Sequence, residues 1–125
     1  MSTEIQFTNR ELDVMAVLWR TEGATVAEVQ ERLGDELAYT TVLTILRTLE
    51  EKGYVEHTQE GKAYRYRALV DRELAGASAV RRLIGKMFQG SPELLLTHLV
   101  SDRALSKKDL EELRRLVDQR LGKKE

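Results

Sequence analysis

Residues 38–53, AYTTVLTILRTLEEKG, run directly into residues 54–68, YVEHTQEGKAYRYRA, and the spacing of apolar residues changes between the two stretches. In the first stretch apolar residues recur three and four positions apart, which predicts a helix over residues 38–52 that ends at Gly53. In the second stretch they alternate, which predicts strands over residues 54–58 and 63–68 with a turn over residues 59–62. We therefore expect a helix followed directly by a β-hairpin.

Two further helices are predicted upstream, because each begins with a threonine followed three residues later by a glutamate. In such a capping box each side chain hydrogen-bonds a free amide of the first turn. Thr8 and Glu11 open a helix over residues 8–20, and Thr25 and Glu28 open a second helix that stops at Gly34. We expect Phe7 to pack on Leu12, and the first helix to face inward along Leu12, Met15, Ala16 and Trp19. With residues 35–37 as a connection, three helices and a hairpin give a winged helix-turn-helix.

The rest of the chain is predicted to be helical. Asp71 caps a helix that runs to about residue 88, Ser91 and Pro92 open the next helix, and Ser106 with Asp109 opens the last. The apolar side of the first of these helices is expected to be Leu74, Ala77, Ile84, Met87 and Phe88. The predicted fold class is thus mainly α, with a winged-helix DNA-binding domain in residues 1–70 and a three-helix dimerisation region in residues 71–125.

The three C-terminal helices carry more apolar surface than they can bury among themselves. A second copy of the chain offers a solution, since a two-fold interface buries one patch against itself and obligate homodimer interfaces resemble a core cut in half. The alternative is that these helices fold back on the N-terminal half. We expect a homodimer formed through Met87, Phe88, Leu95, Leu96, Leu99, Leu110, Leu113, Leu116 and Val117.

Composition excludes several classes of protein. The 125 residues contain no cysteine, which excludes disulfides, thiolate metal sites and cysteine nucleophiles. No stretch approaches the roughly 20 apolar residues of a membrane span and the N-terminus lacks the pattern of a signal peptide, so we expect a cytoplasmic protein without membrane insertion. His57 and His98 lie on separate predicted elements without matching carboxylate spacing, and nothing resembles a nucleophile–base pair. We therefore expect no metal, no cofactor and no enzyme activity.

The outer face of the third helix is the most informative surface in the sequence. Once the core positions are set aside, hydroxyl side chains and an arginine remain three and four positions apart, namely Thr40, Thr41, Thr44, Arg47, Thr48 and Glu51. In a major groove, hydroxyls bond phosphates or base edges, threonine methyls contact thymine methyls and arginine forks onto guanine. The start of the helix at Tyr39 also presents backbone amides to a phosphate. Because threonine is a poor helix former, we favour DNA contact over a merely solvated face.

Two hairpin residues and one helix cap are further candidates for DNA contact. Lys62 at the turn and Arg65 on the outward strand face are placed to reach a phosphate backbone or an adjacent minor groove. The alternative, equally favoured by the sequence, is that they are solvated charges that protect an edge strand. Thr25 is first a helix cap, and a phosphate contact there would be additional. The DNA-binding residues that we expect are thus Thr25, Tyr39, Thr40, Thr41, Thr44, Arg47, Thr48, Lys62 and Arg65.

The distribution of charge runs against this assignment. Residues 1–70 contain 8 Lys and Arg against 12 Asp and Glu, a net −4, whereas residues 71–125 contain 12 against 9, a net +3. DNA-binding domains usually carry a basic footprint. Our hypothesis is that non-specific affinity is weak and that target selection needs two half-sites bound together. The alternative is a winged-helix protein–protein interaction module, although protein-binding helices more often display aromatic residues or leucines.

Motifs along nearly the whole chain carry a family resemblance. They are AYTTV at residues 38–42, LEEKG at 49–53, and LS at 105–106 leading into DLEEL at 109–113, together with EL, VM and LW in residues 11–19. With these motifs the chain resembles the penicillinase-repressor family of the BlaI, MecI and CopY type. The resemblance implies a dimeric repressor on palindromic operators of β-lactamase or related antibiotic-response genes, with a winged helix on each half-site and intertwined C-terminal helices.

The resemblance also concerns regulation. In several family members induction proceeds by proteolysis within the C-terminal domain, triggered by a membrane-bound antibiotic sensor. The family cleavage point is typically an Asn-Phe pair, and the matching position here is the pair His98 and Leu99, the candidate proteolytic-induction site. This departure leaves the inducing signal open. The copper-responsive branch carries a C-terminal cysteine motif, which this chain lacks.

Overall fold

The computed structural model describes residues 5–34 and 37–122. The chain divides into two compact units, Met1–Ala79 and Val80–Glu125, and the boundary falls inside one helix. Within the described ranges six α-helices and one small antiparallel sheet are present, which confirms the predicted mainly helical, winged-helix fold class. The predicted connection over residues 35–37 lies outside the described residues, except for Leu37.

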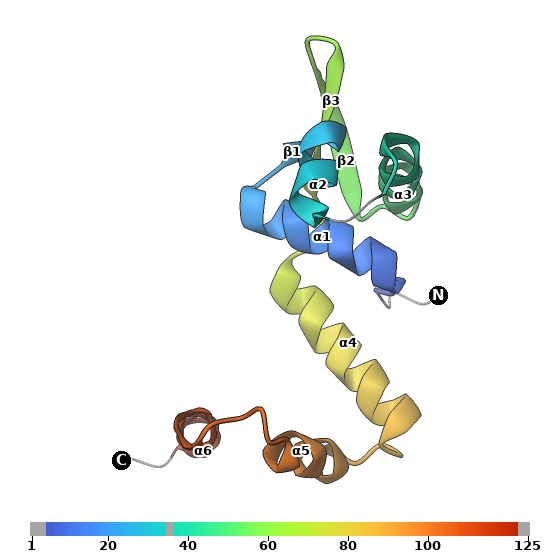
Figure 1. Cartoon of the computed structure of the whole chain (residues 1–125). Helices are drawn as coiled ribbons and strands as arrows, with labels where there is room; N and C mark the ends of the chain where they lie inside the picture. The colour runs from blue at the N-terminus through green and yellow to red at the C-terminus, as the bar shows by residue number, and fades with distance from the viewer. Residues whose placement is uncertain (1–4, 35–36, 123–125) are drawn as a thin grey trace. The chain divides into compact units, whose positions relative to one another are not determined.

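The first unit is a winged helix (Figure 1). Its elements are α1 (Asn9–Thr21), β1 (Ala24–Thr25), α2 (Val26–Leu33), α3 (Tyr39–Glu51), β2 (Val55–Glu60), β3 (Ala63–Ala68) and the start of α4 (Arg72–Met87). The strands are ordered β1-β3-β2 and every pairing is antiparallel. The β2–β3 hairpin extends beyond the helices in Figure 1, as a wing does.

The predicted capping boxes of α1 and α2 are confirmed. The Glu11 amide donates to Thr8 Oγ1 at 3.1 Å, and the Thr8 amide donates to Glu11 Oε1 at 2.9 Å. Thr25 and Glu28 make the same pair of bonds at 3.2 and 3.0 Å. Gly34 then ends α2 in the left-handed conformation, with φ of 69°. These local signals fix where the helices begin and end, because each uses only residues of one turn.

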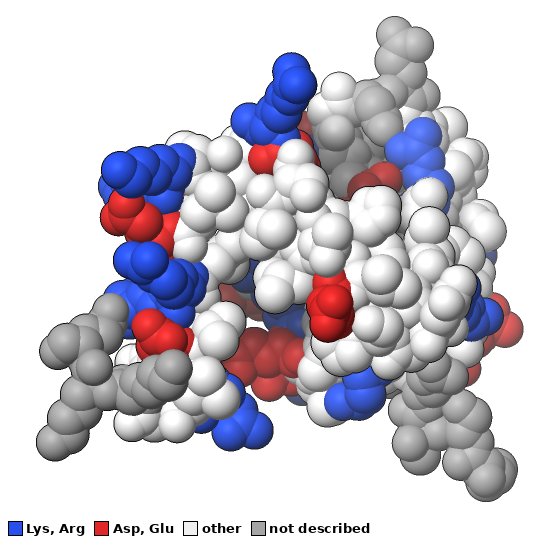
Figure 2. Space-filling view, turned by 90° about the horizontal axis from the view of Figure 1, so that it is seen from below, with Lys and Arg blue, Asp and Glu red and all other residues white. Residues whose placement is uncertain are grey.

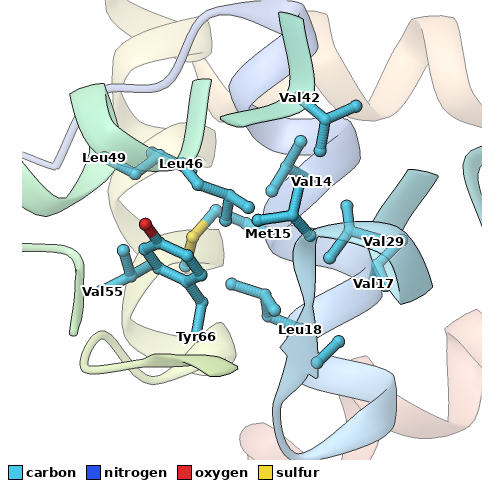
Figure 3. Packing of buried hydrophobic residues seen from close by; sticks show 12 residues of the cluster. Val14, Met15, Val17, Leu18, Val29, Val42, Leu46, Leu49, Val55 and Tyr66 are labelled. Atoms are coloured by element: carbon cyan, nitrogen blue, oxygen red, sulfur yellow. The ribbon is translucent and has the colours of Figure 1, made fainter. Parts of the chain in front are cut away.

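The face of α1 that packs inward differs from the prediction. Val14, Met15, Val17 and Leu18 are buried in the core, together with residues of α2, α3, β2 and β3 (Figure 3). Of the predicted stripe only Met15 is fully buried, and Leu12 is 46% exposed. Phe7 packs edge-on against Trp19 and Tyr54, with ring centroids 6.1 and 5.0 Å away. The prediction was wrong because residues 14–19 are all apolar, so the spacing of apolar residues there does not select one face.

The sheet also departs from the prediction in two ways. Register continues to the pair Glu60 and Ala63, so the turn holds two residues, Gly61 and Lys62, rather than residues 59–62. A short strand, β1, adds Ala24 and Thr25 to the edge of β3. Before it, Gly23 has φ of 123°, and a side chain there would stand 3.3 Å from the Tyr66 carbonyl oxygen. Two residues of β1 offer no alternating pattern, so the sequence did not predict this strand.

The first half of α4 packs into the winged-helix unit through a different side from the one predicted. Ala75 and Ser78 are buried, and Ser78 Oγ donates to the Ile5 carbonyl oxygen at 3.3 Å. Leu74, which was expected on the apolar side, is 57% exposed. The first unit therefore extends through the first turns of α4 to Ala79.

The second unit holds the end of α4 with α5 (Pro92–Ser101) and α6 (Lys107–Arg120). The predicted caps are present, since Ser91 Oγ accepts the Leu94 amide and Ser106 with Asp109 forms a capping box. Neither α5 nor α6 contains a buried residue. Across the described ranges no helix is both long enough and apolar enough to cross a membrane.

Candidate nucleic-acid interface

The predicted recognition surface lies on α3 opposite the core. Val42, Leu46 and Leu49 are fully buried and fix the helix against α1 and α2. On the opposite side Tyr39, Thr40, Thr41, Thr44 and Arg47 are exposed, and Thr48 is partly exposed. The structure therefore brings the predicted hydroxyl and arginine side chains together on one face, which we call the α3 outer face.

The α3 outer face presents hydrogen-bond acceptors and methyl groups. Thr44 Oγ1 donates to the Thr40 carbonyl oxygen at 2.9 Å, and Thr48 Oγ1 donates to the Thr44 carbonyl oxygen at 3.0 Å. Because these bonds use the hydroxyl protons, the oxygens are left as acceptors. Acceptors suit the amino groups of adenine and cytosine in a major groove, and threonine methyls suit thymine.

The start of α3 differs from the starts of α1 and α2. Its N-cap is Ala38, which makes no side-chain hydrogen bond to the helix, whereas threonine caps the other two. The amides of its first turn thus lack a side-chain acceptor, and such amides bind phosphate well. The phosphate contact expected at Tyr39 stays a prediction, and no side-chain cap occupies these amides.

The wing arginine Arg65 is held by carboxylates. Its guanidinium donates to Glu60 through Nε at 2.9 Å and to Glu28 through Nη1 at 3.2 Å. The hydrogen bonds with Glu60 raise the pKa of Arg65, and the same bonds lower the pKa of Glu60. Thr25 is partly exposed beside this cluster and caps α2. A phosphate would have to compete with both carboxylates for Arg65.

Arg47 and Lys62 have no such competitor. Among the residues that the structure describes, neither forms an ion pair or a side-chain hydrogen bond, and both are exposed. Arg67, the remaining wing cation, is paired with Glu56. Of the described Lys and Arg residues on α3 and in the wing, Arg47 and Lys62 are therefore without a carboxylate partner.

A contact that the sequence did not reveal joins α3 to the wing. His57 Nδ1 of β2 lies 2.8 Å from both carboxylate oxygens of Glu50 on α3. The imidazole also packs against the rings of Tyr64 and Tyr66, with centroids 4.7 and 5.3 Å away. This contact links the wing to α3. Within the described part of the chain no cluster of three or more His, Asp or Glu side chains could hold a metal ion.

A second unpredicted contact anchors the end of α3. Lys52 Nζ lies 2.9 and 2.8 Å from the two carboxylate oxygens of Glu11, whose residue is only 5% exposed. Burial alone would raise the pKa of Glu11, but the hydrogen bonds from Lys52 and from Thr8 outweigh it and the pKa is lowered. The sequence marked Glu11 only as the capping-box glutamate of α1. In the structure the same carboxylate both caps α1 and binds Lys52.

The residues expected at a dimer interface lie in the second unit, which includes the end of α4. Met87, Leu96, Leu99, Leu116 and Val117 are exposed, while Phe88, Leu95, Leu110 and Leu113 are partly exposed. Exposed neighbours that were not on the predicted interface are Leu83, Leu94, Val100 and Leu121. Figure 2 shows Lys and Arg in blue and Asp and Glu in red on the side seen from below, with uncharged side chains in white between them.

The candidate cleavage pair lies in α5. His98 packs against the Phe88 ring, with centroids 5.2 Å apart. Leu99, the next residue of α5, is exposed. The peptide bond between them is helical. A protease would have to unwind this part of α5, because proteases act on extended chain at exposed, poorly ordered sites.

The fold and the α3 outer face define a winged helix-turn-helix protein. The sequence profile described as penicillinase repressor matches residues 7–119. The chain belongs to the penicillinase repressor family.

Named relatives agree with this membership. The chain is 40% identical over 91 residues to the transcriptional regulator BlaI of Mycobacterium tuberculosis, covering 70% of this chain and 66% of BlaI. It is 22% identical over 117 residues to the methicillin resistance regulatory protein MecI of Staphylococcus aureus, covering 92% of this chain and 95% of MecI. It is also 22% identical over 121 residues to the penicillinase repressor of Bacillus licheniformis, covering 95% and 94% of the two chains.

Solved structures resemble the chain in fold. The DNA-binding domain of the repressor BlaI superposes with a TM-score of 0.51 and 30% identity, covering 58% of this chain and 90% of that domain. A MarR mutant from E. coli superposes with a TM-score of 0.54 and 17% identity, covering 93% of this chain and 79% of MarR. Family members are transcriptional regulators and not enzymes.

Proposed function

We propose that this protein is a transcriptional repressor that binds double-stranded operator DNA through the α3 outer face. The observation that carries the proposal is the placement of hydroxyls and an unpaired arginine on one exposed helix face, opposite three fully buried anchors. The likeness to the DNA-binding domain of BlaI supports it. The genes under control are then those of β-lactamase or a related antibiotic response, as in the named relatives.

In this proposal each side chain has a stated role. Thr40, Thr41, Thr44 and Thr48 contact base edges and phosphates, while Arg47 reads guanine or binds a phosphate. Tyr39 with its neighbouring amides positions the helix start on the backbone, and Lys62 extends the contact from the wing turn. Thr25 and Arg65 are secondary contacts, since Thr25 caps α2 and Arg65 is paired with Glu28 and Glu60.

We propose further that the protein acts as a homodimer on a palindromic operator, with residues 71–125 as the dimerisation region. The second unit has leucines and valines exposed along α5 and α6 and no buried residue in either helix. A two-fold interface would cover them and would place two α3 helices for two half-sites. A membrane-bound sensor would act indirectly, by triggering cleavage of the peptide bond between His98 and Leu99. This cleavage would separate the two subunits.

The test measures binding of the full chain to the DNA upstream of its own gene, with random-sequence DNA of equal length as competitor. The variant Thr44→Ala with Arg47→Ala removes two side chains of the α3 outer face, and we expect its affinity to fall at least tenfold. The matched control is Arg20→Ala with Thr21→Ala on α1, where Thr21 Oγ1 donates to the Val17 carbonyl oxygen as Thr44 does on α3. Equal loss in both double variants, or in neither, would reject the assignment.

A further inference from the structure

A stripe of α1 at the margin of the core forms part of a cavity. Leu12 is exposed, Ala16 and Trp19 are partly buried on the same side of α1, and Arg20 adjoins them in the last turn. With Arg72 from the first turn of α4 they line a cavity of about 310 Å³. All five residues belong to the first compact unit. We call this set the α1 outer cavity.

The apolar wall of the α1 outer cavity is held in place. Trp19 Nε1 donates to the Val70 carbonyl oxygen at 2.9 Å, and the Trp19 ring packs edge-on against Phe7. These contacts fix the indole in one orientation, with its polar N–H already satisfied. What the wall offers a ligand is therefore aromatic and aliphatic surface, since Leu12 and Ala16 add only carbon atoms.

The polar groups of the α1 outer cavity are two cations. In the part of the chain that the structure describes, neither Arg20 nor Arg72 forms an ion pair or a side-chain hydrogen bond, and both are exposed. The lining of the cavity contains no carboxylate. Glu22 and Asp71 line a second cavity that shares Trp19 and Arg72, but the Asp71 carboxylate already accepts the amide of Glu73.

We propose that the α1 outer cavity binds a small organic anion, namely a carboxylate carried on an aromatic or similarly flat apolar ring. A guanidinium binds a carboxylate through two parallel hydrogen bonds, and two unpaired guanidiniums beside an apolar wall match the two ends of such a molecule. The volume lies at the lower end for ligand sites, which suits a one- or two-ring compound. The proposal does not rest on DNA binding.

The test titrates the full-length, 15N-labelled protein with 2-naphthoate and follows the indole N–H resonance. Trp19 is the only tryptophan of the chain, so this resonance reports directly on the cavity wall. For a ligand of this size we expect saturation with a Kd on the order of 1 mM. The neutral analogue 2-naphthalenemethanol has the same ring system and is expected to bind at least tenfold more weakly.

Variants locate the binding. Arg20→Gln and Arg72→Gln should each weaken the binding of 2-naphthoate by about tenfold, because each removes one guanidinium–carboxylate contact. Arg81→Gln, which changes an exposed arginine of α4 outside the cavity, should leave it unchanged. Dispersed backbone amide resonances like those of the parent verify that the free variants are folded. The proposal is overturned if the resonance does not saturate by about 10 mM, if the alcohol binds equally well, or if both glutamine variants bind like the parent.

Discussion

The two compact units use similar leucines and valines in opposite ways. In the first unit residues of α1, α2, α3, β2 and β3 together bury a continuous core, including Leu18, Leu46 and Leu49 (Figure 3). In the second unit α5 and α6 bury none of theirs, and Leu96, Leu99 and Leu116 are exposed. The comparison teaches that the winged helix has a core within one chain, whereas α5 and α6 leave their apolar side chains exposed or only partly buried.

The difference in leucine burial between the two units implies a difference in stability. Burial of a leucine side chain stabilises a protein by about 1.5–3 kcal/mol relative to exposure, and the first unit gains this at each core position. The exposed leucines of the second unit gain little within one chain. We infer that their burial comes from association with a second copy, so the stability of the second unit should depend on protein concentration.

The largest effect is expected when one leucine is replaced by alanine in each unit, which tests the difference in burial between the units. Leu46→Ala, at a residue that is 0% exposed, should lower the free energy of unfolding by about 3 kcal/mol through lost burial and a residual cavity. Leu96→Ala, at a residue that is 46% exposed, should leave unfolding of the first unit unchanged and weaken self-association instead. Chemical denaturation followed by Trp19 fluorescence measures the first effect, and sedimentation measures the second. Similar losses of unfolding free energy in both variants would remove the contrast between the units.

A second prediction separates the subunits directly. Leu96→Asp combined with Leu116→Asp places two charges in the expected interface, where an unpaired charge is costly to bury. We expect a monomer at micromolar concentration and a loss of operator affinity of about 100-fold, or about 2.7 kcal/mol. Sedimentation and fluorescence anisotropy on operator DNA measure these quantities. Leu69→Asp, at an exposed leucine of the first unit, is the control and should change neither.

A third prediction concerns the ion pair that holds the end of α3 in the self-sufficient unit. Because the folded-state pKa of Glu11 lies below its ordinary value, its contribution is complete above the ordinary value and is lost as pH falls through the folded pKa. The unfolding temperature of the parent should therefore fall as the pH is lowered from about 5 to about 3. Glu11→Gln keeps a capping side chain but not the charge, so it should cost about 1 kcal/mol at pH 7 and less at pH 3.

The control for that prediction is Asp13→Asn, since Asp13 is paired with Arg10 on the exposed side of α1. Surface pairs of this kind contribute about 0–1 kcal/mol, so this variant should follow the parent closely over the same pH range. If Glu11→Gln and the parent show parallel pH profiles, the carboxylate–ammonium contact does not contribute to stability.

The smallest effect distinguishes the free and the paired cations of the DNA-binding unit. Arg47→Gln should lower the salt dependence of operator binding by about one unit of slope, because one phosphate-neutralising charge is lost. Arg65→Gln should lower the slope less, since Glu28 and Glu60 already neutralise that guanidinium. Equal changes in slope would mean that Arg65 leaves its carboxylates when DNA binds. A slope on random DNA as steep as that on the operator would contradict our hypothesis of weak non-specific affinity.

Much of the fold could be predicted from the sequence because its signals are local. The capping boxes at Thr8, Thr25 and Ser106 act within one helical turn, and the hairpin follows from alternation over a few residues. The α3 outer face could be predicted for the same reason, since a helix with three apolar anchors leaves only one side for its hydroxyls. The length of the turn could not be predicted, because the exact register between β2 and β3 decides it. The strand β1 could not be predicted either, because it exists only through pairing with β3, far along the chain.

Sequence by itself thus determined where the helices begin, the period of the helices and of the hairpin strands, and which face of α3 is polar. Only the tertiary structure decided which of several apolar sides of α1 faces the core, leaving Leu12 and Trp19 beside Arg72. It also decided that Arg65 meets Glu28 and Glu60, which lie 37 and 5 positions away. The physical reason is that a helix cap needs partners from its own turn, whereas the choice of a buried face or an ion pair needs partners that folding alone brings close.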